Sequence, residues 1–168
     1  MSETNLTIAN RFRGFFPVIV DVETAGFDPL KDALLEIAAV TLKLNDKNHW
    51  CIDEVMSKHT KPFDGANLDA ASLEFTGIDP DHPFRKQIAV TESEAFNEIF
   101  KIIRKKTKDN KCSRAILVGH NSSFDLSFLN ACVERNNIKR NPFHPFSSFD
   151  TATLAGLIYG QTVLSKAA

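Results

Sequence analysis

The sequence has 168 residues, of which 43% are hydrophobic and 24% charged, and its formal net charge is −1. This composition is typical of one globular domain with a buried core, and the net charge excludes a general attraction of the whole chain to nucleic acid. The three cysteines are far apart and form no CxxC pair, which favours a reducing cytoplasm over a disulfide framework or a zinc site. Few apolar residues occur near the N-terminus, so we expect neither a signal peptide nor a membrane span.

Three runs in the first half of the chain have the residue pattern of strands, at 16–22, 35–43 and 50–58. Asp46 and Asn48 predict a hairpin turn between the second run and the third. Pro62 and Gly65 then break the chain. Asn67 is expected to cap a short helix that runs through Ala71 and Phe75, and turn residues predict a loop at 77–83.

The second half of the chain alternates helical patterns with a strand. Thr91 or Ser93 is expected to cap a helix with one apolar stripe, formed by Ala95, Ile99, Ile102 and Ile103. Residues 114–119 predict a short buried strand, and Ser122 or Ser123 begins a helix that runs through Phe128, Leu129 and Val133.

The C-terminal part of the chain, from about residue 140 onward, contains two prolines and one further expected helix. Pro142 and Pro145 predict a loop, after which Asp150 is expected to cap a final apolar helix. Residues 162–168 begin a new helical pattern without a cap or a polar tail. We therefore expect residues 1–168 to form a single α/β domain, a mixed sheet flanked by helices, that is incomplete at its C-terminus.

Asp21 and Glu23 lie at the end of the first strand, where residues i and i+2 point to the same side. Two carboxylates held side by side repel each other unless a cation lies between them, and a divalent metal is the usual solution. Strand ends also carry paired acids for no catalytic reason, so this pair alone does not decide between a metal site and a solvated edge.

Asp125 follows the strand at 114–119, in the first turn of the next helix. In α/β sheets, ligands collect at such strand-to-helix edges. A third carboxylate there would complete a set of hard oxygen donors suited to Mg²⁺ or Mn²⁺ rather than to zinc. Two such ions can activate water and stabilise the leaving oxygen of a phosphodiester.

The segments Asp-Val-Glu-Thr-Ala-Gly-Phe at 21–27 and Gly-His-Asn-Ser-Ser-Phe-Asp at 119–125 together resemble the DEDD superfamily of 3′→5′ exonucleases. Within it, residues 139–151 resemble the bacterial ribonuclease T family, in the DEDDh branch. The similarity runs from about Arg11 to the last residue.

This resemblance implies a ribonuclease H-like fold, here without its last helix. It also implies a homodimeric 3′→5′ exoribonuclease that uses Mg²⁺, two ions per site, to trim the single-stranded 3′ ends of tRNA and other stable RNAs. Asp21, Glu23 and Asp125 match three of the four carboxylates of the family, as metal ligands and catalytic residues.

The DEDDh branch also has a histidine base and a fourth aspartate on a later helix, and no residue of this sequence matches them. His144 and Asp150 are separated by Pro145 and have the wrong spacing, and His120 is expected to brace the turn before Asp125. We therefore expect the chain to be inactive, or nearly so, by itself, because the loss of a general base lowers the rate by roughly 10²–10⁴-fold.

Fourteen phenylalanines accompany a single tryptophan and a single tyrosine, and most phenylalanines are expected in the core. By resemblance, four match the aromatic residues that stack against the terminal bases: Phe27, Phe75, Phe124 and Phe146. Relatives carry a glutamate where this chain has Ala71, which leaves the preference for the 3′ base open.

Basic residues cluster at 101–114, near the N-terminus and at 139–140. A single run of this kind is more often a solvated helix face, but it also fits a phosphate-binding patch, and composition alone does not choose between the two. By resemblance, four basic residues match a patch that holds RNA leading into the partner's active site: Arg11, Arg13, Arg114 and Lys139.

Three alternatives remain beside the exoribonuclease. A DNA-directed 3′→5′ exonuclease of the same superfamily would share the carboxylates, although residues 139–150 and the phenylalanines favour RNA. A non-catalytic RNA-binding fragment would keep stacking and phosphate contacts without hydrolysis. An ordinary α/β domain with surface acids is the least favoured interpretation.

Overall fold

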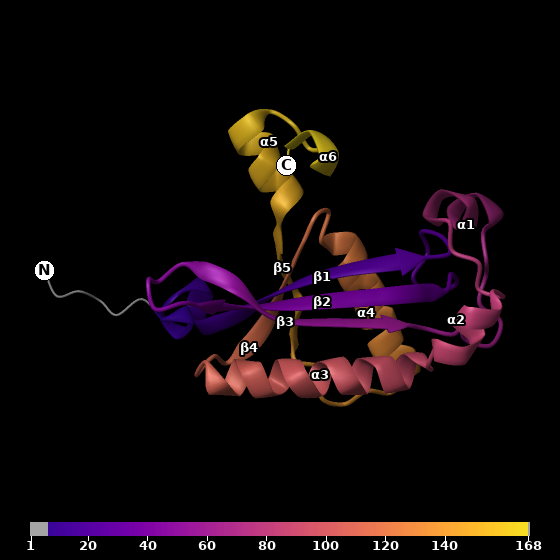
Figure 1. The fold of residues 1–168 in the computed structure, drawn as a ribbon, viewed down its shortest axis with the longest axis horizontal. Coiled ribbons are helices and arrows are strands. Elements are labelled where there is room, and N and C mark those ends of the chain that lie inside the picture. Colours follow the sequence, from indigo (N-terminus) through magenta and orange to yellow (C-terminus); the bar gives the residue numbers. More distant parts are fainter. Residues whose placement is uncertain (1–6, 168) are drawn as a thin grey trace, which may run out of the picture.

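The structure is a computed structural model that describes residues 7–167, and in this range the chain forms a five-stranded sheet in the order β3-β2-β1-β4-β5 (Figure 1). The strands are β1 (Phe15–Thr24), β2 (Leu34–Leu44), β3 (Trp50–His59), β4 (Arg114–Gly119) and β5 (Phe143–Asp150). β1, β2 and β3 are antiparallel neighbours, whereas β1, β4 and β5 pair in parallel. The predicted mixed sheet of an α/β fold is therefore confirmed.

The helices in the described range are the 3₁₀ turns η1 (Ile8–Asn10) and η2 (Phe12–Gly14) and the helices α1 (Ala70–Thr76), α2 (Pro83–Ile88), α3 (Glu92–Asp109), α4 (Ser123–Arg135), α5 (Thr151–Tyr159) and α6 (Leu164–Ala167). Two of them, α3 and α4, pack against one face of the sheet, and the others lie at its ends or project from it (Figure 1). Figure 1 shows α3 running along the sheet, α1 and α2 at one end of it, and α5 and α6 projecting away from it. None of the helices within residues 7–167 has the length and apolar character needed to cross a membrane.

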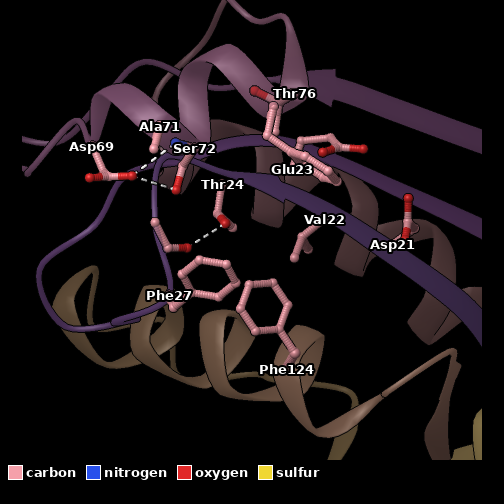
Figure 2. Close-up of a pocket in the computed structure, with 12 residues that line it drawn as sticks. Asp21, Val22, Glu23, Thr24, Phe27, Asp69, Ala71, Ser72, Thr76 and Phe124 are labelled. Atoms are coloured by element: carbon pink, nitrogen blue, oxygen red, sulfur yellow. Dashed lines mark hydrogen bonds between the residues drawn. The ribbon is translucent and has the colours of Figure 1, made fainter.

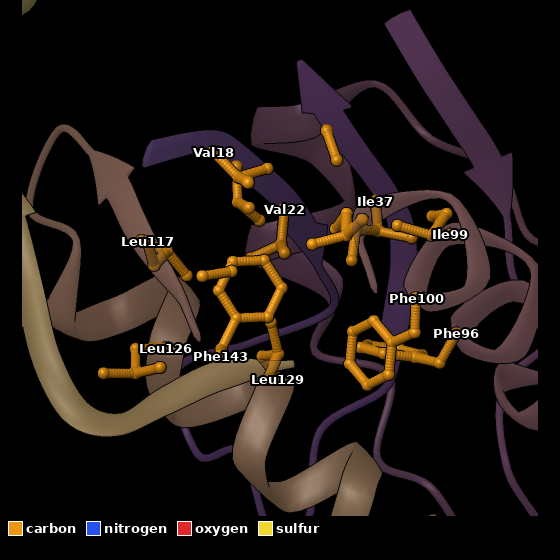
Figure 3. Close-up of a cluster of buried hydrophobic side chains, with 14 of the residues drawn as sticks. Val18, Val22, Ile37, Phe96, Ile99, Phe100, Leu117, Leu126, Leu129 and Phe143 are labelled. Carbon is orange, nitrogen blue, oxygen red and sulfur yellow. The ribbon is translucent and has the colours of Figure 1, made fainter. Parts of the chain in front are cut away.

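The core lies between the sheet and the two long helices α3 and α4 (Figure 3). Phe16, Val18, Val20 and Val22 of β1 are buried on this side, because alternate residues of a strand face the same way. They contact a cluster that includes Phe96, Phe100, Leu126, Leu129 and Phe143. The intervening residues of β1 face the opposite side, and the strand pattern thereby separates the core from the acidic pair Asp21 and Glu23.

Local sequence signals explain where α3 and α5 begin. The Thr91 side chain accepts the Glu94 N–H, and the Glu94 carboxylate accepts the Thr91 N–H at 2.8 Å, which is a complete capping box. Asp150 accepts the Ala152 N–H at 2.9 Å and caps α5 as predicted.

Two local predictions are wrong, those for the α1 cap and for residues 143–150, and the helix α2 was not predicted. Asp69 caps α1, not Asn67, and accepts the Ser72 N–H at 2.8 Å. Residues 83–88 form the helix α2, with Pro83 at its N-terminus, where the missing N–H has no intrahelical partner to lose. Residues 143–150 form β5 rather than a loop, because β5 is an edge strand and its register with β4 shifts between Ala115 and Leu117, which accommodates Pro145.

Candidate active site

The acidic pair lies on a part of β1 that extends beyond its neighbour β4. The two strands pair from Phe15 to Ile19, and β4 ends at Gly119. Asp21 is exposed and Glu23 is half-buried. Figure 2 shows both side chains on one side of β1 and Val22 on the other. The strand therefore presents two carboxylates on one face, as the alternation of the sequence predicts.

Asp125 lies beside this extension of β1, in the first turn of α4. Its Oδ1 accepts the Val22 N–H at 3.1 Å, and the residue is 4% exposed. A Cβ on Gly119 would lie 3.2 Å from Asp125 Oδ2, closer than most Cβ contacts, so glycine at the end of β4 leaves room for the carboxylate. The third predicted acid thus reaches the strand that carries the other two.

Burial and neighbouring acids raise the pKa values of Asp125 and Glu23. Burial, followed by the negative charge of Asp21, raises the pKa of Asp125 to about 7. Burial also raises the pKa of Glu23, with further contributions from Asp21 and Glu36. Repulsion of this kind is relieved by a cation, and three carboxylates are the hard oxygen donors that Mg²⁺ and Mn²⁺ prefer.

The carboxylates of Asp21, Glu23 and Asp125 are chemically suited to a divalent metal. In this conformation, however, they are too far apart to hold one ion together. Within residues 7–167, no three carboxylate, imidazole or thiol groups lie close enough together to hold a metal ion. Asp125 is turned toward the backbone of Val22, whereas Asp21 and Glu23 face the groove described next. Metal binding therefore requires the three carboxylates to converge further.

A groove of about 480 Å³ brings together Asp21, Glu23 and three of the four predicted phenylalanines, Phe27, Phe75 and Phe124. Phe27 is 83% exposed and Phe75 is 91% exposed, although both are large apolar residues. The rings of Phe27 and Phe124 lie 6.1 Å apart between centroids, edge to face, and Figure 2 shows them beside each other. Exposed rings beside carboxylates are suited to stacking against unpaired bases next to a phosphate.

Phe146, the fourth predicted phenylalanine, does not line this groove. It lies on β5, is 80% exposed, and contacts the ring of His144 at 4.5 Å between centroids. The structure therefore does not bring Phe146 together with the other three.

Several groove residues were not anticipated as site residues. Thr24, Asp69, Ser72 and Thr76 line it together with Ala71. The Asp-x-x-Ser spacing at 69–72 is a helix-cap signal that could have placed Asp69 and Ser72 at the start of α1.

Glu36 is a further acid near the site that sequence reading missed. It lies directly opposite Glu23 in the β1–β2 register. Its Oε1 accepts a hydrogen bond from Arg85 Nη1 at 2.7 Å and lies 2.8 Å from His59 Nδ1. These partners offset the charge of the Glu36 carboxylate and fix its position. Glu36 therefore has its own partners and does not act as a free acid beside Glu23.

No histidine is among the residues described as lining the groove. His120 Nδ1 lies 3.1 Å from Thr151 Oγ1, and its Nε2 lies 2.7 Å from the Thr162 carbonyl oxygen. His120 therefore braces the turn, which confirms its predicted structural role. His144 Nδ1 accepts the Ser147 N–H at 3.0 Å.

The predicted phosphate-binding residues lie away from the groove. Arg11 and Arg13 are exposed, with their guanidinium groups over the rings of Phe12 and Phe15. Arg114 begins β4 and lines a hollow of about 560 Å³ with Arg104, Lys108, Lys111 and Arg140. Lys139 lines a neighbouring hollow that shares Arg104 and Arg140.

Arg114 and the acidic pair lie at opposite ends of β1. Arg114 pairs with Phe15 at the start of β1, whereas Asp21 and Glu23 lie near its end. A rise of about 3.3 Å per residue gives a separation of roughly 20–26 Å. Arg114 therefore does not lie next to Asp21 and Glu23 of the same chain.

Comparison with known proteins agrees with this architecture. The family model RNase_T, described as exonuclease, matches residues 18–167. Similar solved structures include E. coli Exonuclease I with a dT13 oligonucleotide (TM-score 0.65, 19% identity), with dA16 (0.65, 19%), and with ssDNA in a zinc-bound form (0.64, 20%). In each comparison 86% of this chain and 30% of the other chain are covered.

The chain thus spans about a third of the length of the Exonuclease I structures. At 19–20% identity these likenesses show the fold, and that fold is the ribonuclease H-like α/β fold of exonucleases. The family match covers nearly all of the sequence, including both acidic segments. This chain therefore belongs to the RNase_T exonuclease family.

Proposed function

We propose that this chain is a 3′→5′ exoribonuclease domain that acts on the single-stranded 3′ ends of tRNA and other stable RNAs. One observation carries the proposal: a single groove combines the carboxylates of Asp21 and Glu23 with the exposed rings of Phe27 and Phe75. A nuclease that trims unpaired ends needs both features, because the rings hold bases of any sequence and the acids hold the metal beside the phosphodiester.

Each proposed site residue has a distinct task. Asp21, Glu23 and Asp125 would hold divalent metal, on which this family generally depends, and we propose Mg²⁺. When bound, two such ions activate water and stabilise the leaving oxygen. Asp125 is kept near β1 by the Val22 N–H, so α4 and β1 position their acids relative to each other.

The aromatic residues would hold the 3′ end. Phe27, Phe75 and Phe124 stack on the terminal bases, each contributing roughly 1–3 kcal/mol, and we propose Phe146 as a further contact from outside the groove. Ala71 lines the groove with a methyl group. A methyl group makes no hydrogen bond to a base edge, so this position does not select the terminal base.

We propose that RNA is held by a homodimer. The separation of roughly 20–26 Å along β1 between Arg114 and the acidic pair supports this arrangement, because a short 3′ end in one groove does not reach Arg114 of the same chain. Arg11, Arg13, Arg114 and Lys139 of one subunit would contact phosphates of the strand that enters the partner's groove. The free cysteines Cys51, Cys112 and Cys132 fit the cytoplasm, where we propose the protein acts.

A DNA-directed 3′→5′ exonuclease is the second candidate. It is favoured by the similar E. coli Exonuclease I structures, whose oligonucleotides are dT13 and dA16. The resemblance of residues 139–151 to the ribonuclease T family supports RNA instead.

Matched single-stranded RNA and DNA of the same sequence, labelled at the 5′ end, would test both candidates. We expect Mg²⁺-dependent shortening from the 3′ end that is faster for RNA and abolished by Glu23→Gln. The rate is expected to be low, because no described groove residue is a histidine that would serve as the base. Faster shortening of DNA would favour the second candidate. RNA binding without any shortening would indicate a binding fragment, and no binding to either strand would contradict the proposal.

A further inference from the structure

Two segments that frame the groove are joined side by side along their backbones. Residues 25–33 connect β1 to β2 and carry Phe27, and residues 66–69 lead into α1, which carries Phe75. Asn67 N–H donates to the Lys31 carbonyl at 2.7 Å, and Ala33 N–H donates to the Asn67 carbonyl at 3.2 Å. The rings on either segment therefore depend on how the two segments are held together.

Asp32 is the central side chain of this junction. It is buried, its Oδ2 accepts the Asp28 N–H at 2.8 Å, and its Oδ1 accepts a hydrogen bond from Asn67 Nδ2 at 2.6 Å. Gly26 has a φ of +158°, and a Cβ there would lie 2.0 Å from Asp32 Oδ2. The carboxylate thus fills the inside of the loop that carries Phe27 and extends from it to the neighbouring segment.

Apolar packing beneath the junction is small. The buried cluster there consists of Ala25, Ala33 and Leu35, contacted by Ala66, Leu73 and Ile78. α1 is seven residues long and contains no buried residue. Because hydrophobic burial scales with apolar area, α1 depends more on polar links to its neighbour than a core helix does.

We propose that Asp32 and Asn67 are positioning residues that set the separation of Phe27 and Phe75. This inference rests on the proposed function, and it adds the device that keeps the two exposed rings ready for a terminal base. Neither residue is among those that line the groove. They act through the backbone, by locking the Phe27 loop to the segment that begins α1.

The test uses variants of Asn67, which is exposed and whose backbone bonds remain after substitution. Asn67→Ala removes the donor, and Asn67→Asp places a second carboxylate against Asp32. The probe is a short single-stranded RNA or DNA with 2-aminopurine at its 3′ end, whose fluorescence falls on stacking, titrated in EDTA so that no hydrolysis occurs.

We expect Kd to rise about 5-fold for Asn67→Ala and 10-fold or more for Asn67→Asp. The Tm of Asn67→Ala should stay close to that of the parent chain. Asp32→Asn combined with Asn67→Asp restores a donor–acceptor pair with exchanged roles, and it should recover most of the binding. Asn97→Ala is the matched control and should bind like the parent. It also removes one hydrogen bond donated by an exposed asparagine, here to Ser93 on α3.

A double-mutant cycle with Phe75→Ala separates positioning from general loosening. If Asn67 acts through the ring, Asn67→Ala should weaken binding little further once Phe75 is absent. Hydrogen exchange of residues 25–33 and 70–76 should also be faster in free Asn67→Ala than in the parent. If both Asn67 variants bound the probe as the parent does, this inference would be overturned and the proposed function would stand. A parent chain that binds neither probe would overturn the proposed function, and the inference with it.

Discussion

Asp125 Oδ1 accepts the Val22 N–H at 3.1 Å and so joins the first turn of α4 to the strand that carries Asp21 and Glu23. Val22 lies three residues beyond the last β1–β4 pair, where no strand within residues 7–167 supplies an acceptor on that side. The side-chain carboxylate takes the place of a strand carbonyl. The acid that we propose as a metal ligand is thereby positioned by the same hydrogen bond that completes the sheet edge.

Gly119→Ala should disturb this arrangement. The new Cβ would lie 3.2 Å from Asp125 Oδ2 and 3.3 Å from Ser122, so either the carboxylate or the turn must move. We expect a loss of about 1–2 kcal/mol in the free energy of unfolding and at least a 10-fold loss of exonuclease rate, measured by urea unfolding and 3′ trimming. Gly156→Ala, whose Cβ would meet Thr162 at a similar 3.3 Å away from the acids, is the control. Equal rates for the two variants would contradict the prediction.

Stability in metal-free buffer should fall as the pH rises through the Asp125 titration. The folded chain raises the pKa of Asp125 from 3.8 to about 7 through burial and the charge of Asp21. A raised folded pKa contributes stability that is complete below the unfolded value, near pH 4, and is lost as the pH rises to about 7. Urea unfolding should therefore show Asp125→Asn to be more stable than the parent by about 1–3 kcal/mol at pH 8, with a smaller difference at pH 5. The same difference at both pH values would show that ionisation of Asp125 is not the cause.

Divalent metal should offset the loss of stability that repulsion among the clustered acids causes. At pH 8, millimolar Mg²⁺ or Mn²⁺ should raise the Tm of the parent chain, because an ion that binds only the folded state stabilises it. Asp21→Asn and Asp125→Asn should each show a much smaller rise, measured by thermal unfolding with and without EDTA. Asp81→Asn removes an exposed acid outside the groove and should respond like the parent. A metal response that survives both site substitutions would place the bound ion elsewhere.

Phe27→Ala and Phe75→Ala should weaken binding of single-stranded RNA without changing stability. Both rings are exposed, so their removal takes little apolar surface out of the core, while each stacked base loses roughly 1–3 kcal/mol. Fluorescence anisotropy and thermal unfolding measure the two effects separately. Phe146→Ala is the informative comparison, since Phe146 lies outside the groove. Unchanged binding by Phe146→Ala would remove Phe146 from the proposed substrate contacts.

The ion pair between Glu92 and Arg135 should be the most important charged contact for stability. Glu92 is 4% exposed and accepts hydrogen bonds from Arg135 Nε and Nη2 at 2.8 and 3.0 Å, and Arg135 Nη1 also donates to the Pro29 carbonyl at 3.0 Å. Glu92→Ala leaves a half-buried guanidinium without its partner, and we expect a loss of about 3 kcal/mol in urea unfolding. Asp109→Ala, which removes the exposed pair with Lys105, should change stability by less than about 0.5 kcal/mol. Similar losses for the two variants would contradict this ranking.

Local patterns were sufficient for much of the fold. The positions of the first three strands, the cap at Thr91 and the cap at Asp150 were predicted correctly, because each depends on residues only a few positions apart. β5 and α2 were missed. Pro145 argues against a strand unless that strand is known to lie at a sheet edge, and the sheet order is a property of the whole fold.

For the site, the sequence by itself determined that Asp21 and Glu23 share one face, because the two-residue period of a strand requires no tertiary contact. Residue patterns also indicated the exonuclease superfamily and the acid at 125. Only the tertiary structure decided that Phe27, Phe75 and Phe124 line one groove while Phe146 does not. The pairing of Glu23 with Glu36, and of Asp32 with Asn67, likewise depends on strand register and on loops that meet in space. Such contacts join residues far apart in the chain, and their geometry follows from packing rather than from any local pattern.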